Sequence, residues 1–149
     1  MKLAPRALPE LLAGRRIASV TGTNGKTTTT HFLTAAVRAE TPDGQRSVVT
    51  NADGANLYHG IVSALGQAPN ATIAVLETDE RVVADVVAMG SPEVLVLLNF
   101  SRDQLDRNHE LTCLGRNWRA ALEKAAEHGP TVVANACDPL IVWVCQKAR

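Results

Sequence analysis

Hydrophobic residues along the chain follow two alternating patterns. Short unbroken apolar runs, typical of strands buried on both faces of a parallel sheet, occur at 72–76 and 94–98. Longer segments such as 113–128 instead place their apolar residues on one helical face. The expected strands are 17–20, 47–50, 72–76, 94–98 and 131–134, and the expected helices are 28–39, 57–65, 81–89, 113–128 and 140–146.

This alternation of strands with helices predicts an α/β fold, with a mostly parallel sheet flanked by helices and right-handed crossovers. Hydrophobic residues make up 46% of the chain but aromatic residues only 3%, so the core must consist mainly of aliphatic side chains. The 149 residues suit one domain, with 1–15 as a lead-in that holds a short helical turn at 8–12, and 16–149 as the domain itself. In such sheets ligands bind at the carboxyl ends of the strands.

Charge and cysteine content exclude several classes of partner. The formal net charge is zero, so no basic surface for nucleic acid is indicated. Three irregularly spaced cysteines do not make a disulfide framework, which favours a reducing cytoplasm. No apolar run approaches the roughly 20 residues of a spanning helix, and the first residues lack the apolar centre of a signal peptide. We therefore expect a cytoplasmic protein with no transmembrane segment.

The clearest chemical signal is a glycine-bearing loop between the first expected strand and the first expected helix. Gly22 and Gly25 lack a Cβ, so backbone N–H groups can approach an anion there. The following helix adds unpaired N–H groups and the positive end of its dipole. Lys26 supplies a positive charge for the β- and γ-phosphates of a nucleotide, and Thr27 offers a hydroxyl to Mg²⁺. The alternative is a glycine-rich turn with a solvated lysine.

The strict phosphate-loop pattern places a glycine five positions before Gly25, where this chain has Val20. The longer string TGTNGKTTT at 21–29 closely resembles the ATP-binding loop of the Mur ligase family, which includes folylpolyglutamate synthases. The resemblance implies a P-loop NTPase-like central domain, present here in part, that binds ATP and Mg²⁺. The nucleotide-binding residues that it implies in this loop are Thr21, Gly22, Thr23, Asn24, Gly25, Lys26, Thr27 and Thr28.

An acidic residue follows the buried apolar run at 72–76. Glu77 would lie beside the loop and, with Thr27, would give Mg²⁺ two of the hard oxygen ligands that it prefers. We therefore predict Lys26 and Glu77 as catalytic residues, and Thr27 and Glu77 as metal ligands. The alternative for Glu77 is a cap on the following helix. Asp79 and Glu80 either support the site indirectly or are solvated acids.

A second segment, NFSRDQLDRN at 99–108, is similar to the family's Asn-x-x-x-Asp-His-Leu-Asp-Arg run. The matching positions are Asn99, Asp103, Leu105, Asp106 and Arg107. Asn99 is thereby implied as a nucleotide contact. Gln104 replaces the family's histidine, a ligand of a second magnesium ion, so a second metal bound in the usual way is in doubt. Arg119 stands near the place of the family's carbamylated lysine, and either supplies that position with a charge or is a surface residue.

In these departures the chain resembles one branch of the family, the ATP-using subunits of lipid II amidotransferases. The runs TNADGAN at 50–56 and NACDP at 135–139 are also similar to runs in those subunits. In the first run Asn51, Gly54 and Asn56 either contact nucleotide or substrate phosphate or form a plain turn. That branch carries a cysteine-rich zinc ribbon, which these residues lack. We predict no zinc site in this chain, although the full-length protein could hold one.

The resemblance implies ATP-dependent amidation of the D-glutamate carboxyl group in the lipid II stem peptide. An acyl phosphate would form first and would react with ammonia from a partner glutaminase subunit in a heterodimer. Family members have a larger central domain and a further C-terminal domain, so we expect these residues to be a first part that is inactive alone. The alternatives are another Mur ligase or folylpolyglutamate synthase, or a truncated nucleotide-binding module without turnover.

Overall fold

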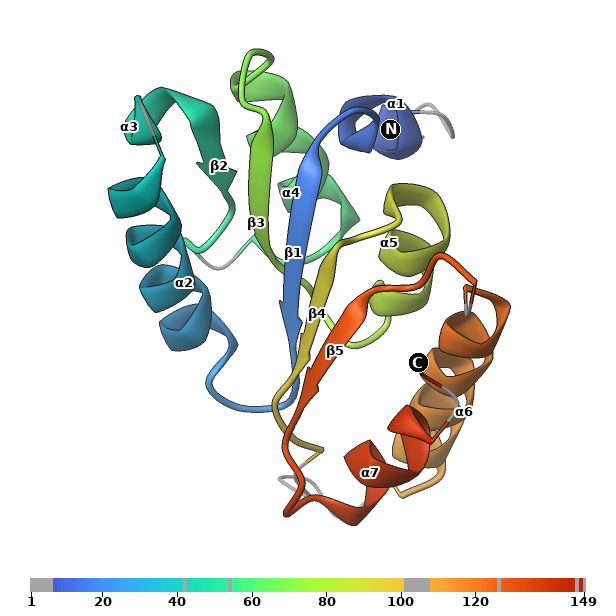
Figure 1. Ribbon diagram of the computed structural model, residues 1–149. Helices are drawn as coiled ribbons and strands as arrows, with labels where there is room; N and C mark the ends of the chain where they lie inside the picture. The colour runs from blue at the N-terminus through green and yellow to red at the C-terminus, as the bar shows by residue number, and fades with distance from the viewer. Residues whose placement is uncertain are drawn as a thin grey trace.

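The computed structural model describes residues 7–41, 43–53, 55–100, 108–125, 127–146 and 148, without the side chains of 44, 45 and 108–111. Its centre is a five-stranded sheet in the order β2-β3-β1-β4-β5, in which every neighbouring pair is parallel (Figure 1). The strands are β1 Arg16–Thr21, β2 Val48–Thr50, β3 Ile73–Glu77, β4 Val94–Leu97 and β5 Thr131–Ala134. The predicted α/β class with a mostly parallel sheet is therefore confirmed.

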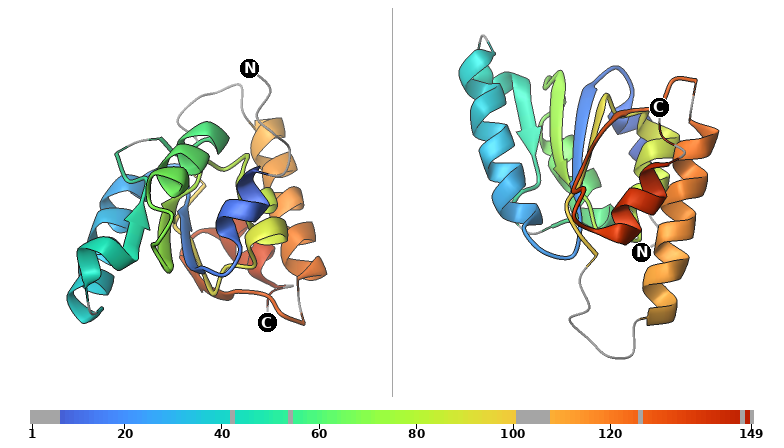
Figure 2. Two further views of the ribbon diagram at one scale, coloured as in Figure 1. Left: turned by 90° about the horizontal axis from the view of Figure 1, so that it is seen from above. Right: turned by 60° about the horizontal axis from the view of Figure 1, so that its bottom comes forward.

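Helices cover both faces of this sheet, as Figure 2 shows. One face carries α2, with the short α3 beyond its end, and the other carries α1, α4, α5, α6 and α7. The helices are α1 Ala7–Leu12, α2 Lys26–Glu40, α3 Gly44–Ser47, α4 Tyr58–Gln67, α5 Val83–Gly90, α6 Asn108–Lys124 and α7 Pro139–Cys145. Within the described ranges no helix combines the length and the apolar composition needed to cross a membrane.

Two boundaries differ from the prediction. The helical turn α3, which the pattern did not indicate, takes in Ser47, the first residue of the expected strand at 47–50. The long helix α6 ends at Lys124, four residues before the predicted end, and Glu127 and His128 beyond it are exposed. It also begins five residues before the predicted start, in a polar stretch that apolar spacing could not assign.

The core lies between the sheet and the helices of the more heavily covered face. One cluster joins α1, α4 and α5 to the first three strands, and the other joins α5, α6 and α7 to β4. Leu8 and Leu12 of α1 are fully buried, so the predicted helical turn is confirmed and contributes to the core. Trp118 is buried, and Trp143 packs against the second cluster.

Because the strands are parallel, β1, β3 and β4 end at the same edge of the sheet, the lower edge in Figure 1. Residues 22–25, 78–82 and 98–100 follow those ends and thus come together. Val20 lies beside Glu77 of β3 on one side and Val96 of β4 on the other. The loop between β1 and α2 therefore lies beside the residues that follow β3 and β4, with Glu77 next to it as expected.

Candidate nucleotide-binding site

The loop between β1 and α2 turns on two glycines with positive φ. Gly22 has φ 138°, and Gly25 has φ 84° in the left-handed region and immediately precedes α2. A Cβ on Gly22 would lie 2.8 Å from the backbone nitrogen of Asn99 and from the Cβ of Leu98. Glycine is therefore required at 22 by the closeness of the neighbouring strand end as well as by the backbone angle.

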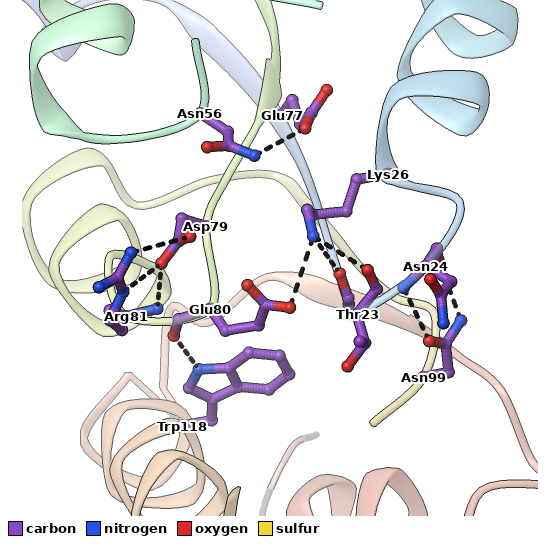
Figure 3. Close-up of polar contacts among 11 residues, drawn as sticks. Thr23, Asn24, Lys26, Asn56, Glu77, Asp79, Glu80, Arg81, Asn99 and Trp118 are labelled. Atoms are coloured by element: carbon purple, nitrogen blue, oxygen red, sulfur yellow. Dashed lines mark hydrogen bonds and ion pairs between the residues drawn. The ribbon is translucent and has the colours of Figure 1, made fainter. Parts of the chain in front are cut away.

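Asn99 holds the same loop from the end of β4 (Figure 3). Its Oδ1 accepts a hydrogen bond from the backbone N–H of Asn24 at 3.0 Å, and its Nδ2 donates to the Asn24 carbonyl at 3.0 Å. The backbone N–H of Thr23 donates to the Asn99 carbonyl at 2.8 Å. Asn99, predicted as a nucleotide contact, therefore shapes the loop. The backbone N–H groups of Thr23 and Asn24 thus both donate to Asn99.

The ammonium group of Lys26 lies over the loop. It donates to the carbonyls of Gly22 at 2.6 Å and Thr23 at 3.3 Å, and it pairs with Oε1 of Glu80 at 3.4 Å (Figure 3). The Lys26 side chain is only 14% exposed and that of Glu80 17%. The three contacts use the three N–H donors of an ammonium group. The alternative of a solvated lysine is therefore wrong.

Glu77 is the last residue of β3, and it is only 2% exposed. Its Oε1 accepts a hydrogen bond from Nδ2 of Asn56 at 2.8 Å, whereas its Oε2 is buried without a partner. A buried carboxylate oxygen without a partner is costly, and it is the kind of ligand that a hard divalent cation prefers. The helix-cap alternative does not fit, because α5 begins only at Val83.

Asn51 fixes the position of Glu77 through the backbone. Its Nδ2 donates to the carbonyls of Glu77 at 2.8 Å and Ala55 at 2.9 Å, and its Oδ1 accepts from the Glu77 N–H at 2.8 Å. Both N–H bonds of the amide are thus used inside the protein, and the residue is 5% exposed. Asn51, predicted to bind nucleotide, supports the metal-ligand candidate instead. Gly54 of the same run lies outside the described residues.

The two acids after Glu77 have different surroundings. Asp79 pairs with Arg81, accepting hydrogen bonds from its backbone N–H at 3.0 Å and from its Nε at 2.9 Å. Burial acts to raise the pKa of Asp79, but the hydrogen bonds and charge of Arg81, with the charge of Lys26, outweigh it and hold that pKa below its ordinary value. Glu80 instead reaches Lys26, so it is Glu80 that contacts the loop.

Thr27 and Thr28 are exposed in the first turn of α2, whereas Thr21 is buried and its hydroxyl oxygen has no partner. The structure thus brings Gly22, Gly25 and Lys26 together with a buried carboxylate at one strand edge. A hollow of about 430 Å³ adjoins the loop on the α2 side, within the range of small-ligand sites. Its lining includes Asn24, Gly25, Thr29, Leu98, Asn99 and Asn135.

Part of the second predicted segment cannot be placed, because Asp103, Gln104, Leu105, Asp106 and Arg107 lie outside the described residues. In the part of the chain that is described, no three His, Cys, Asp or Glu side chains gather as a metal cluster would.

Arg119 belongs to the packing of α6 on α7. Its guanidinium lies 4.7 Å from the ring centroid of Trp143 and donates to the Trp143 carbonyl and to Oε1 of Gln146. This favours the surface alternative for Arg119 over a role at the site.

Sequence reasoning missed a connection made by Asp138. Its Oδ1 accepts hydrogen bonds from the N–H groups of Leu140 at 2.9 Å and Ile141 at 3.2 Å, which caps α7. Its Oδ2 accepts from the Phe100 N–H at 2.7 Å and so ties the residue after Asn99 to the end of β5. The Asp-Pro pair signalled the helix start, but no sequence signal pointed to Phe100.

Comparison with known proteins shows to which family this chain is similar. The family described as Mur ligase middle domain matches residues 20–148. The lipid II isoglutaminyl synthase (glutamine-hydrolyzing) subunit MurT of Staphylococcus aureus (strain COL) is 34% identical over 127 residues, which are 84% of this chain and 28% of that protein. The corresponding MurT of Streptococcus pneumoniae (strain ATCC BAA-255 / R6) is 36% identical over 137 residues, 89% of this chain and 29% of that protein.

Other relatives are amino acid ligases. The UDP-N-acetylmuramoylalanine--D-glutamate ligase of Desulfotalea psychrophila (strain LSv54 / DSM 12343) is 31% identical over 141 residues, 93% of this chain and 28% of that protein. A solved UDP-N-acetylmuramoyl-L-alanyl-D-glutamate--2,6-diaminopimelate ligase shares the fold, with a TM-score of 0.64 and 23% identity over 95% of this chain and 31% of that one. The chain thus spans less than a third of the length of these relatives.

Proposed function

This chain belongs to the Mur ligase family, and we propose that it binds the phosphates of ATP on the loop between β1 and α2. The observation that carries the proposal is the position of the Lys26 ammonium. It is held over the carbonyls of Gly22 and Thr23, at the same strand edge as the buried carboxylate of Glu77. A lysine there can neutralise phosphate charge, and the N–H groups at the start of α2 have no partner within the helix.

The residues present fit a magnesium ion. The hydroxyl of Thr27 and the carboxylate of Glu77 would hold it, since Oε2 of Glu77 is buried and without a partner. When bound, the ion would neutralise charge on the phosphates. Asn51 and Asn56 keep the Glu77 carboxylate in place, and Asn99 keeps the loop in shape. The predicted contacts from Thr21 and Thr28 remain part of the proposal.

Within the family we propose the amidotransferase branch, on the support of two MurT relatives at 34% and 36% identity. In this reaction the γ-phosphoryl group of ATP passes to the D-glutamate carboxylate of the lipid II stem peptide, leaving ADP and an acyl phosphate. Ammonia, released from glutamine by a GatD-like glutaminase subunit, then attacks the acyl carbon, and phosphate leaves to give D-isoglutamine. The reaction would take place in the cytoplasm, at the inner face of the membrane that holds lipid II.

This chain spans under a third of the length of its relatives. For the chain itself we therefore propose neither an acceptor site nor a contact with the glutaminase. A second candidate is an amino acid ligase of the same family, favoured by the 31% identity to the D-glutamate ligase. Product analysis of a complete protein with ammonia or D-glutamate as the nucleophile would separate the two. The third candidate is a truncated nucleotide-binding module without turnover.

The test is calorimetric titration of Mg-ATP into the chain and into Lys26→Ala. We expect binding by the wild type and a loss of at least about tenfold in affinity in the variant, because a charge contact to phosphate is removed. Lys124→Ala, at the exposed end of α6, is the matched control and should bind as the wild type does. If the folded wild type does not bind, or if both variants bind equally well, the loop is not the nucleotide site.

A further inference from the structure

We propose that Glu80 makes the loop selective for polyphosphate that carries a divalent cation over the free polyanion. The inference rests on the proposed phosphate site and adds a specificity-determining residue to it. Its basis is the ion pair between Oε1 of Glu80 and Nζ of Lys26, 3.4 Å long and formed by side chains that are 17% and 14% exposed. A pair so little exposed is screened by water and salt much less than a surface pair.

The polypeptide around Glu80 is held in place. The indole Nε1 of Trp118 donates to the Glu80 carbonyl at 2.8 Å, and Trp118 itself is 1% exposed with its ring centroid 4.5 Å from that of Phe100. On the other side, the N–H of Asp79 donates to the Asn56 carbonyl at 2.9 Å. The turn closes with a bond from Val82 N–H to the Asp79 carbonyl at 2.9 Å. These bonds hold the backbone of Glu80, and the ion pair with Lys26 holds its carboxylate beside the loop.

Among the described residues at this strand edge, carboxylates outnumber basic side chains. Asp79 is paired with Arg81 and Glu80 with Lys26, whereas Oε2 of the buried Glu77 carboxylate has no partner. A polyphosphate that reaches Lys26 must come close to Glu80 and separate or share the ion pair. The carboxylate of Glu80 and a nearby phosphate group repel each other strongly where water is largely excluded. A divalent cation between them makes the net interaction attractive.

Removal of the Glu80 charge should therefore help the free anion more than the magnesium complex. Glu80→Gln keeps the shape of the side chain and can still accept a hydrogen bond from Lys26. The expected changes in affinity for the free anion and for the magnesium complex do not require Glu80 to touch a reacting atom. We therefore assign Glu80 a role in the choice of ligand and not in catalysis.

The experiment is calorimetric titration of sodium tripolyphosphate, with and without Mg²⁺, into the wild type, Glu80→Gln and Glu93→Gln. Glu93 forms the matched control, because it pairs with Arg16 at 3.0 Å on an exposed surface at the start of β1 and β4, the far end of these strands. We expect Glu80→Gln to raise the affinity for free tripolyphosphate by about tenfold or more, and to change the affinity for the magnesium complex by less than about threefold. Glu93→Gln should leave both affinities unchanged.

Two results would overturn the inference and leave the phosphate site standing: no change in either affinity in Glu80→Gln, or an equal fall in both. The second would mean that Glu80 only holds Lys26. If the folded wild type binds neither the magnesium complex nor Mg-ATP, the proposed function fails first. Glu80→Asp, which keeps the charge, provides a second variant; it should keep the wild-type preference, and loss of that preference would contradict the inference.

Discussion

At the scale of single residues, the site depends on positions where one side chain satisfies several backbone groups. Asn51 bonds both the N–H and the carbonyl of Glu77, and Asn99 does the same for Asn24. Asn51 was predicted as a ligand contact from its place after a strand end, and Asn99 from the family resemblance. The sequence could not indicate the backbone partners that the structure gives them, since an amide serves a ligand or a backbone equally well.

Gly22 offers the sharpest test at this scale. We expect Gly22→Ala to lower the free energy of unfolding by about 1–3 kcal/mol, because of its φ of 138° and the 2.8 Å approach to Asn99. Urea unfolding followed by circular dichroism would measure the change. Gly66→Ala in α4 is the control, since a Cβ there meets nothing within 4 Å, and alanine should raise stability by up to about 1 kcal/mol. Equal effects of the two changes would contradict the proposed role of the strand contact.

At the scale of elements, the connections after β3, β4 and β5 are bound to one another by side chains. Glu80 and Trp118 join the β3–α5 turn to α6, and Asp138 joins the end of β4 to the start of α7. The strands themselves were predicted within about one residue, because buried apolar runs carry a strong local signal. The links between their ends were not, since each joins residues far apart in the chain and leaves no local pattern.

The pairing of Asp79 with Arg81 should make stability depend on pH. The pKa of Asp79 is held below its ordinary value of 3.8 in the folded protein, so the pair stabilises the fold above that value. The contribution is lost as the pH falls through the lower folded pKa. We expect wild type and Asp79→Asn to differ in free energy of unfolding at neutral pH and to converge in acid. A difference that persists at the lowest pH would show that the charge is not responsible.

Asp138 should be worth more than an ordinary helix cap. Asp138→Ala removes the cap of α7, at a cost of about 1–2 kcal/mol, and also removes the acceptor of the Phe100 N–H. Denaturant unfolding of this variant should show a larger loss than Asp53→Ala, an exposed acid in a loop. A loss no greater than that of the control would mean that neither bond matters.

At the scale of the whole molecule, the strand order explains why one edge collects the chemistry. β1 lies in the middle of the sheet, between β3 and β4, so its loop is flanked by the ends of both neighbours. The alternation of elements was enough to predict the α/β class, and it also gave the expectation that ligands bind at this edge. It could not predict which acid reaches Lys26, because Asp79 and Glu80 are adjacent and differ only in their three-dimensional surroundings.

The position of β1 also has a consequence in time. A ribosome makes β1 and its loop before β4, and the partner that shapes the loop, Asn99, is synthesised 75 positions after Asn24. Until β4 has been synthesised, Gly22 lacks the strand end that it contacts in the folded protein, and Lys26 lacks the surroundings that bury it. The loop between β1 and α2 can therefore take its shape in the nascent chain only after β4 has been synthesised.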